Sequence, residues 1–367
     1  MTRRKALLTV GGGIGVVASG YAWSERRGLT REDLVSEPAP SLSSQMNSLL
    51  TYAALAPSGH NAQPWSVRVA ADSVRIGSDQ SRWLSKVDPH NREMALSIGA
   101  FLENLLIACP GHGYQADFAI TGSNPSDGDL IQVRLAKTTE TARNALEPLR
   151  LRRTVRTGQL SRPLSGEDVD PLTHYFEQHA HYFPRESREG RFLAQGTIEA
   201  NRAQARRDDA QAELAEWIRF SNADARTRRD GLTQESMEIA GFAGWYVRHF
   251  MGSQSVMSRT FRDQGVDRVQ QQVASCGGWI LVTSPDSSLE SLVETGRKTE
   301  RMWLSARDRQ VAIHPMTQLL EESPFRDQIG KELGIASPIQ FVLRVGYVEN
   351  YPKPVSLRRL VSSILRT

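Results

Sequence analysis

The sequence predicts an α+β fold. Helical patterns are interspersed with short segments in which apolar and polar residues alternate, and the strands must pair across segments far apart in the chain. The helical pattern is clearest over residues 92–108, whose broad apolar face includes Met94, Phe101 and Leu105. With 367 residues, 39% of them hydrophobic and 23% charged, the chain is long enough for two lobes or one large fused domain.

The first part of the chain is predicted to contain two helices and four strands. The expected helices cover residues 41–56 and 92–108, and the expected strands cover 66–70, 73–77, 114–120 and 130–136. The first two strands are joined at Ala71-Asp72, which is typical of a hairpin. The first lobe is expected to end near Thr138.

The second part is predicted to be richer in helix. We expect helices over 141–153, 165–178, 189–220 and 289–307, and strands over 180–185, 277–284 and 340–346. The helix at 189–220 is long and charged, as a helix with a solvated face would be. Residues 221–261 are expected to be irregular.

The first 25 residues have the pattern of an export signal or a membrane anchor. A basic start with Arg3, Arg4 and Lys5 precedes an apolar, Gly-rich stretch at 6–22. The start resembles a twin-arginine signal, which predicts export to the periplasm or the outer face of the membrane. An uncleaved anchor and a cytoplasmic enzyme are the alternatives. Residues 26–40 are charged, end in Glu-Pro-Ala-Pro, and are expected to form a linker.

Composition argues against several other classes of protein. The net charge is +4, and the basic residues are scattered rather than interleaved with aromatic residues, so we expect no nucleic-acid binding. His179 and His181 lack the Cys or paired carboxylates of a metal site, so none is expected. Cys109 lies in an apolar helical pattern and is expected to be buried; a disulfide with Cys276 is left open.

The run APSGHNAQPW, residues 56–65, combines a turn, two amides and a Trp between a helix and a strand. Asn61 and Gln63 each carry donors and acceptors, which would match the edges of a planar heterocycle. Ser58 and Gly59 allow close approach of the backbone. An ordinary helix-to-strand loop is the alternative interpretation.

The run LRRTVRTG, residues 151–158, is a candidate phosphate site. Arg152 and Arg156 lie four residues apart and would share a face if this segment is helical, with the Thr154 hydroxyl between them. Bidentate guanidinium contacts suit a phosphate better than a point charge does. A solvated basic helix end is the alternative.

Together, these two runs resemble the signatures of the FMN-dependent nitroreductase superfamily. Their order and separation resemble its fused, two-lobed Acg-type subgroup. The resemblance implies a nitroreductase-like fold of two fused halves, each with a mainly antiparallel sheet flanked by helices, at 41–140 and 141–367. It implies FMN as the cofactor, one per chain, and a monomer that could function alone because the fused halves supply both sides of the site.

The resemblance also implies roles for individual residues. Arg152, Thr154 and Arg156 would hold the phosphate and ribityl chain, and Arg358, in the closing segment, would return to the phosphate. The flavin would be faced from the first half by Pro57, Ser58, Asn61 and Gln63. Where many members carry Glu-Gly, this chain has His314, Pro315 and Met316. His314 is the candidate proton donor, and a purely structural histidine is its alternative.

The predicted function is that of an FMN-dependent oxidoreductase. It would pass two electrons from a reduced donor, a nicotinamide or a quinol, to a small acceptor such as a nitroaromatic or a quinone. A non-catalytic flavin-binding or flavin-sequestering protein is the alternative. A third hypothesis is an oxidase or dehydrogenase that acts on a peptide or small metabolite.

Overall fold

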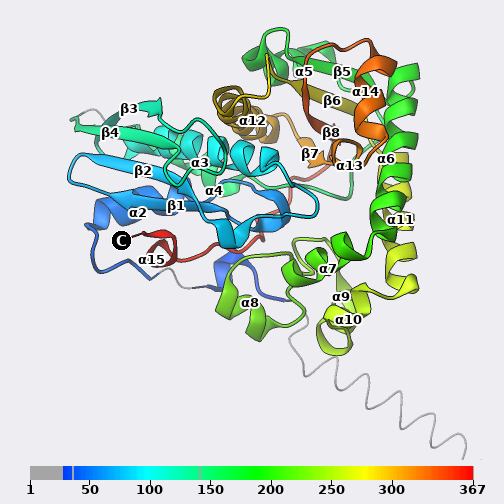
Figure 1. Ribbon diagram of the computed structural model, residues 1–367, viewed down its shortest axis with the longest axis horizontal. Coiled ribbons are helices and arrows are strands. Elements are labelled where there is room, and N and C mark those ends of the chain that lie inside the picture. Colours follow the sequence, from blue (N-terminus) through cyan, green and yellow to red (C-terminus); the bar gives the residue numbers. More distant parts are fainter. Residues whose placement is uncertain (1–27, 35–36, 140–141, 367) are drawn as a thin grey trace, which may run out of the picture.

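The computed structural model describes residues 28–34, 37–139 and 142–366. The predicted export signal or anchor at 1–25 therefore lies outside the described residues. The described chain contains two four-stranded sheets, with strand orders β1-β2-β4-β3 and β5-β6-β8-β7, and all neighbours in both sheets are antiparallel. Helices flank both sheets (Figure 1). The prediction of an α+β fold with two antiparallel sheets flanked by helices is confirmed.

The first sheet consists of two hairpin-like pairs. Its elements are α2 (Ser44–Ala53), β1 (Trp65–Val69), β2 (Ser73–Ser78), α3 (Arg92–Gly111), β3 (Tyr114–Ile120) and β4 (Ile131–Lys137). The β1–β2 hairpin pairs Trp65 with Ser78 and Val69 with Val74, as the turn at Ala71-Asp72 predicts. Helix α3 supplies the apolar face that the sequence indicates and forms the centre of this half's core.

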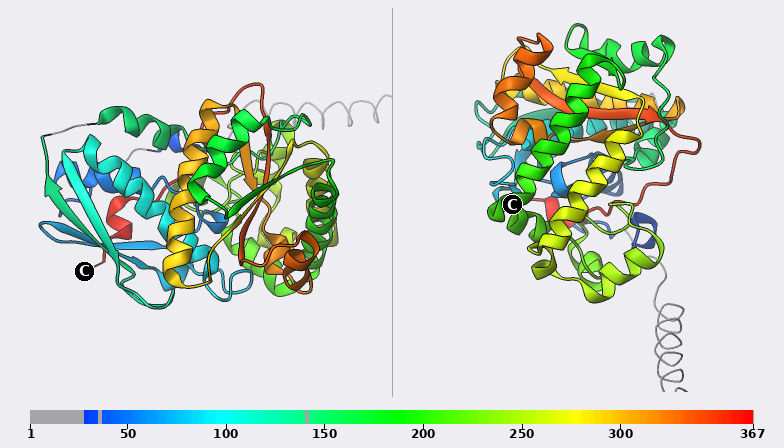
Figure 2. Two further views of the ribbon diagram at one scale, coloured as in Figure 1. Left: turned by 90° about the horizontal axis from the view of Figure 1, so that it is seen from above. Right: turned by 90° about the vertical axis from the view of Figure 1, so that its right-hand side faces the viewer.

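The second sheet is covered on both faces. Its strands are β5 (Ala180–Pro184), β6 (Gly278–Thr283), β7 (Val311–Pro315) and β8 (Ile339–Tyr347). Helices α5 (Gly166–Thr173) and α12 (Leu289–Asp308) pack on one face, and α6 (Arg188–Arg206), α11 (Arg259–Ala274), α13 (Gln318–Glu321) and α14 (Phe325–Leu333) on the other. Figure 2 shows α6 and α11 side by side, in green and yellow. Strand β6 is therefore buried along its whole length.

Three expectations about secondary structure are corrected. The helix expected at 189–220 is two helices, α6 and α7 (Asp208–Trp217). They are separated at Arg207, whose backbone is extended and whose guanidinium pairs with Glu322 at 2.6 Å. The segment expected to be irregular contains α8 (Asn222–Arg228), α9 (Gly241–Phe250) and α10 (Ser253–Val256). Strand β7 and helix α11 were not predicted.

The two predicted halves meet where α3 packs against α12. A Cβ at Gly99 of α3 would collide with the carbonyl oxygen of Val293, and a Cβ at Gly296 of α12 would collide with that of Leu96. The two backbones can approach this closely because both helices carry a glycine at the crossing. The small residues of 92–108 predict such an approach.

The C-terminal segment returns from the second sheet to the first. Helix α15 (Val361–Ile364) packs against α2 and β1, Leu365 bridges to Val67, and the backbone N–H of Arg366 donates to the Val67 carbonyl at 2.8 Å. The core of the first sheet thus draws on residues from both predicted halves. Cys109 and Cys276 are both buried free thiols.

One helix in the described chain, α3, is long and apolar enough to cross a membrane by length and composition. Its most apolar window is 83% buried inside the protein. Helix α3 is therefore the core helix of the first half.

Candidate functional site

A cavity of about 380 Å³ is lined by residues from both halves. Its walls include the loop after α2, the faces of α3 and α12 at their crossing, the end of β7, and the C-terminal segment. Nine of the eleven predicted site residues line it: Pro57, Ser58, Asn61, Arg152, Thr154, Arg156, His314, Pro315 and Arg358. The structure thus brings together two segments about a hundred residues apart in the sequence.

The other two predicted residues do not line the cavity. The Gln63 side chain is fully buried; its Nε2 donates to the Arg229 carbonyl at 3.0 Å, and its Oε1 accepts from the Arg359 N–H at 2.9 Å. Met316 packs in the core behind β7 with Trp279 and Leu319. Because their side chains are committed to the protein interior, we remove both from the set of ligand-contacting residues.

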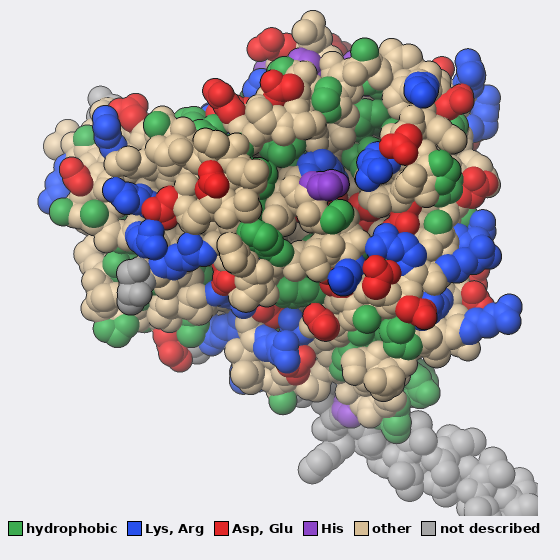
Figure 3. All heavy atoms as spheres, in the orientation of Figure 1, with side chains coloured by type: hydrophobic (Ala, Val, Ile, Leu, Met, Phe, Trp, Pro, Cys, Tyr) green, Lys and Arg blue, Asp and Glu red, His purple; other side chains and the backbone are tan. Residues whose placement is uncertain are grey.

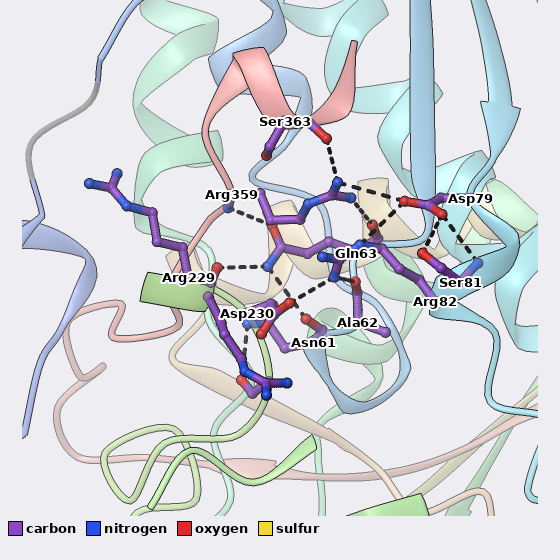
Figure 4. A network of polar contacts seen from close by, with 12 residues as sticks. Asn61, Ala62, Gln63, Asp79, Ser81, Arg82, Arg229, Asp230, Arg359 and Ser363 are labelled. Carbon is purple, nitrogen blue, oxygen red and sulfur yellow. Dashed lines mark hydrogen bonds and ion pairs between the residues drawn. The ribbon is translucent and has the colours of Figure 1, made fainter. Parts of the chain in front are cut away.

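The loop after α2 has an unusual backbone. His60, Asn61 and Gln63 have φ angles of 47°, 53° and 55°, in the left-handed region that residues other than glycine rarely adopt. Each such residue costs about 1–3 kcal/mol, so the conformation needs external support. Hydrogen bonds from the Asn61 and Gln63 side chains to distant segments supply it (Figure 4).

Asn61 is bonded to protein on both sides of its amide. Its Nδ2 donates to the carbonyls of Gly231 and Leu357, at 3.1 and 3.2 Å, and its Oδ1 accepts from Arg358 Nη1 at 3.1 Å. The amide therefore positions the Arg358 guanidinium. Asn61 also lines the cavity, and its contact with a flavin ring stays a prediction.

Three guanidinium groups gather at one end of the cavity, those of Arg31, Arg152 and Arg358. Arg152 and Arg358 both donate to the carbonyl of Leu55, each at 2.8 Å. Burial is the largest cause that lowers the pKa of Arg358, and repulsion from Arg152 and Arg31 adds to it. Burial and then Arg152 likewise lower the pKa of Arg31 to about 10. Mutual repulsion of this kind is what an anion would relieve.

The segment that carries Arg152, Thr154 and Arg156 is not helical. Helix α4 (Leu146–Leu151) ends before it, and Arg152 has the non-helical angles φ −57° and ψ 136°. The three motif residues line one cavity although their segment is not a helix, which corrects the helical expectation.

Glu300 of α12 is the acidic partner at this end. Its Oε1 lies 3.1 Å from Arg152 Nε, and its side chain is fully buried. Asn104, with its amide nitrogen turned towards Glu300, donates to the same oxygen at 3.0 Å. Burial raises the pKa of Glu300 to about 7, against the opposing effects of Arg152 and Arg358. One carboxyl that is only partly ionised at neutral pH leaves this end of the cavity positive.

Arg156 has different neighbours. Its Nη1 donates to the Ser236 carbonyl at 2.8 Å, and its backbone N–H donates to Glu238 at 3.1 Å. Glu238 also pairs with Arg153 at 2.8 Å. Burial lowers the pKa of Arg156 to about 10. Arg152 and Arg156 therefore do not act as a single clamp, and only Arg152 belongs to the positive end.

Two histidines line the cavity beside Arg156. Burial lowers the pKa of His60 to about 4 and that of His314 well below its usual value, so both rings are neutral at neutral pH. The Nδ1 atom of each ring is buried with no hydrogen-bond partner among the described residues. A neutral imidazole offers one N–H and one lone pair to a ligand. This protonation state fits hydrogen bonding by His314 better than proton donation.

The opposite wall carries amides and a carboxyl from α6 and α13. Glu321 accepts from Thr317 Oγ1 at 2.9 Å and from Gln204 Nε2 at 2.5 Å. Burial, and then repulsion from Glu93, raise the pKa of Glu321 to about 8. The Oδ1 of Asn201 and the Oε1 of Gln318 have no partner in the described chain. This wall can hydrogen-bond a polar ligand without adding a full charge.

Sequence reasoning missed several residues of the site, among them Arg31 and Glu300 at its positive end. Arg31 lies in the segment interpreted as a linker, and nothing in its local pattern marks it. Glu300 had a signal: it follows Val293 and Gly296 and precedes Trp303 on the apolar face of α12, at helical spacing. A carboxyl on such a face is either paired or functional.

The chain is similar to curated proteins that are named nitroreductases. Two from Mycobacterium tuberculosis, "Putative NAD(P)H nitroreductase Rv3131" and "Putative NAD(P)H nitroreductase MT3217", are each 27% identical to it over 341 residues, which cover 87% of this chain and 90% of theirs. "Probable NAD(P)H nitroreductase PigM" of a Serratia species is 23% identical over 330 residues, covering 82% of this chain and 88% of its own. The similarity therefore spans more than four fifths of the chain.

No family model matches the chain. A crystal structure of a nitroreductase-named protein from Anabaena variabilis covers 89% of this chain and 95% of its own, at 10% identity. Its TM-score of 0.37 is too low to support a statement about the fold. The architecture rests on the two sheets themselves.

Proposed function

We propose that this protein is an FMN-dependent oxidoreductase of the nitroreductase kind. It would pass two electrons from a reduced donor to a small acceptor, such as a nitroaromatic or a quinone. The observation that carries the proposal is the cavity in which Arg31, Arg152 and Arg358 gather opposite one carboxyl. The names of the relatives support the same class of reaction.

The positive end of the cavity fits the phosphate of FMN. The Nε atoms of Arg152 and Arg358 are buried and make no hydrogen bond within the described residues, although Arg152 Nε is close to Glu300. Guanidinium groups bind phosphate with short, charge-assisted hydrogen bonds. Arg152, Arg358 and Arg31 would hold the phosphate, and Asn61 would keep Arg358 in place.

The remaining cavity fits a flat, polar ring system. Pro57 and Pro315 would provide apolar walls, while His60 and His314 would present unpartnered ring nitrogens. FMN, when bound, would supply the two-electron chemistry, and the protein would orient it and exclude water. Thr154 and Arg156 would face the middle of the ligand. Both walls belong to one chain, so we expect one FMN per chain.

A nicotinamide is the proposed electron donor, on the strength of the relatives' names. A membrane quinol is the second candidate donor, since the sequence predicts export, which would separate the protein from the cytoplasmic nicotinamide pool. Glu321, largely protonated at neutral pH, lies on the cavity wall where it could hydrogen-bond an acceptor oxygen.

The test is an absorption spectrum of the purified protein, followed by turnover measurements. We expect a flavin band equivalent to one FMN per chain, and oxidation of NADH, NADPH or a reduced quinol when a nitroaromatic or quinone is added. Bound FMN without turnover on any donor would favour the non-catalytic flavin-binding alternative. A protein that neither carries FMN nor takes it up would overturn the proposal.

A further inference from the structure

Helix α9 presents an aromatic stripe to solvent. Phe242, Tyr246 and Phe250 are 55%, 49% and 63% exposed, and their spacing of four residues places them along one side of the helix. Leu160 is the other large hydrophobic residue that is exposed in the described chain. The rings of Tyr246 and Phe250 stack with centroids 5.2 Å apart. Phe242 makes a further contact of its own, so the exposed rings of Tyr246 and Phe250 carry the argument for a partner surface.

The other side of α9 is fixed to the protein. Trp245 and Arg248 are buried, and Arg248 pairs with Glu235 at 3.0 Å. The aromatic stripe is therefore held outward by packing rather than exposed by a loose helix. Figure 3 shows hydrophobic side chains gathered over α9 and α10 at the lower end of the molecule.

The described chain begins at this same end. The backbone N–H of Gly28 donates to Glu235 at 2.5 Å, and that of Leu29 donates to Asn222, the first residue of α8, at 3.2 Å. In the sequence, Gly28 follows the apolar stretch at 6–22 and the basic pair Arg26 and Arg27. The segment predicted to meet a membrane is thus joined to the protein next to the aromatic stripe (Figure 1).

We propose that the aromatic stripe of α9 rests on the surface of a lipid bilayer with anionic headgroups. Aromatic side chains favour the level of the headgroups, where an apolar ring and a polar edge are both accommodated. Arg226 and Arg228 are exposed on the adjoining α8, where Arg228 pairs with Asp224. Basic residues next to aromatic ones suit anionic lipid.

The length of the apolar stretch supports this second contact. The apolar, Gly-rich stretch from 6 to 22 is seventeen residues long, which is marginal for spanning a hydrocarbon core. A bilayer contact through α9 adds buried apolar area next to the attachment point and fixes the orientation of the cavity relative to the membrane. The proposal does not depend on which cofactor the cavity holds.

The experiment attaches an environment-sensitive dye to the full chain through Tyr246→Cys or Phe250→Cys, with Leu160→Cys as the control. The native Cys109 and Cys276 are fully buried and should not react. On adding vesicles of phosphatidylglycerol and phosphatidylethanolamine, we expect a blue shift and brighter emission at 246 and 250, and none at 160. Vesicle-bound protein with no change at either stripe position would overturn the proposal, because residues 1–27 alone would then make the contact.

A second measurement keeps lipid binding separate from folding and from the flavin. We expect Tyr246→Ser combined with Phe250→Ser to weaken vesicle binding at least tenfold, while Leu160→Ser leaves it unchanged. The flavin band and the thermal melt of both variants should match those of the parent. Unchanged vesicle affinity, or a dye already in an apolar environment before vesicles are added, would show that another surface or the chain's own residues cover α9.

Discussion

At the residue scale, the site depends on a few charges that are not paired one to one. Arg152 pairs with Glu300, which also acts on the nearby Arg358, and the carbonyl of Leu55 accepts from both guanidinium groups. The pKa values of Arg31, Glu300 and Arg358 are shifted, and in each of them burial disfavours the charged form. Repulsion between the buried guanidinium groups destabilises the empty site, and a bound anion would relieve it. Such an arrangement is typical of anion-binding sites.

The first prediction concerns Arg31. Arg31→Ala should weaken FMN binding about tenfold or more, because a charge-assisted contact contributes about 1.5–3 kcal/mol. Riboflavin, which lacks the phosphate, should bind the variant and the parent equally well. Fluorescence titration with both flavins measures the difference, and Arg68→Ala, whose side chain pairs with Asp129 on the surface, is the control. Equal losses for FMN and riboflavin would mean that Arg31 does not meet the phosphate.

The second prediction concerns pH. Glu300 titrates near pH 7, and above that pH its carboxylate competes with the phosphate for Arg152 and Arg358. FMN affinity should therefore fall from pH 7 to 8.5, by at most about tenfold per pH unit for one coupled proton. Glu300→Gln should bind FMN more tightly at pH 8.5 and lose this dependence. A pH profile that is the same in both proteins would exclude Glu300 as the competing group.

The sign for stability follows from the same raised pKa. The protonated Glu300 is favoured by folding, so its contribution is fully present below the unfolded pKa of about 4.5 and is lost as the pH rises through 7. The free energy of unfolding of Glu300→Gln, taken relative to the parent at the same pH, should therefore rise from pH 5 to pH 8. Urea unfolding at the two pH values measures the gain.

At the element scale, strands were easier to predict than the helices of the second half. The strands β1 to β4 follow from alternation along the sequence. The long helix at 189–220 was wrong because Arg207 turns away to pair with Glu322, a partner far along the chain. Helix α9 was not predicted because its mixture of aromatic residues and glycines shows no clear helical pattern. Its aromatic stripe can be recognised only when the structure shows which side of the helix is packed.

The third prediction belongs to the crossing of α3 and α12. Gly99→Ala or Gly296→Ala should lower the free energy of unfolding by about 1–3 kcal/mol or more, because each new methyl group meets a backbone carbonyl that cannot easily move. Gly265→Ala is the matched control, since its Cβ would meet nothing within 4 Å in α11. Urea unfolding measures the free energies of unfolding of these variants. If Gly99→Ala is as stable as Gly265→Ala, the close crossing is not needed.

At the scale of the whole molecule, the halves are held together by three connections. They are the α3–α12 crossing, the bonds of the loop after α2 to the segments at 229–231 and 357–359, and the C-terminal segment on β1. The first two of these connections line the cavity. The site is therefore expected to lose its shape when either half unfolds.

The fourth prediction tests that coupling. Ile364→Ala removes a buried side chain from the first core and should lower the free energy of unfolding by about 2–5 kcal/mol. Because the halves share their packing, backbone hydrogen-exchange protection should fall together in β1 and β6. A loss of protection confined to β1 would show that the two sheets unfold independently.

The sequence by itself determined the alternation of helices and strands, the two motifs that line the cavity, and the apolar start of the chain. These features are local, so spacing and residue type suffice to reveal them. Only the tertiary structure decided that Gln63 and Met316 face the interior, that Asn61 positions Arg358, and that Arg31 and Glu300 join the site. Such groupings depend on contacts between residues up to 300 positions apart, which no local pattern encodes.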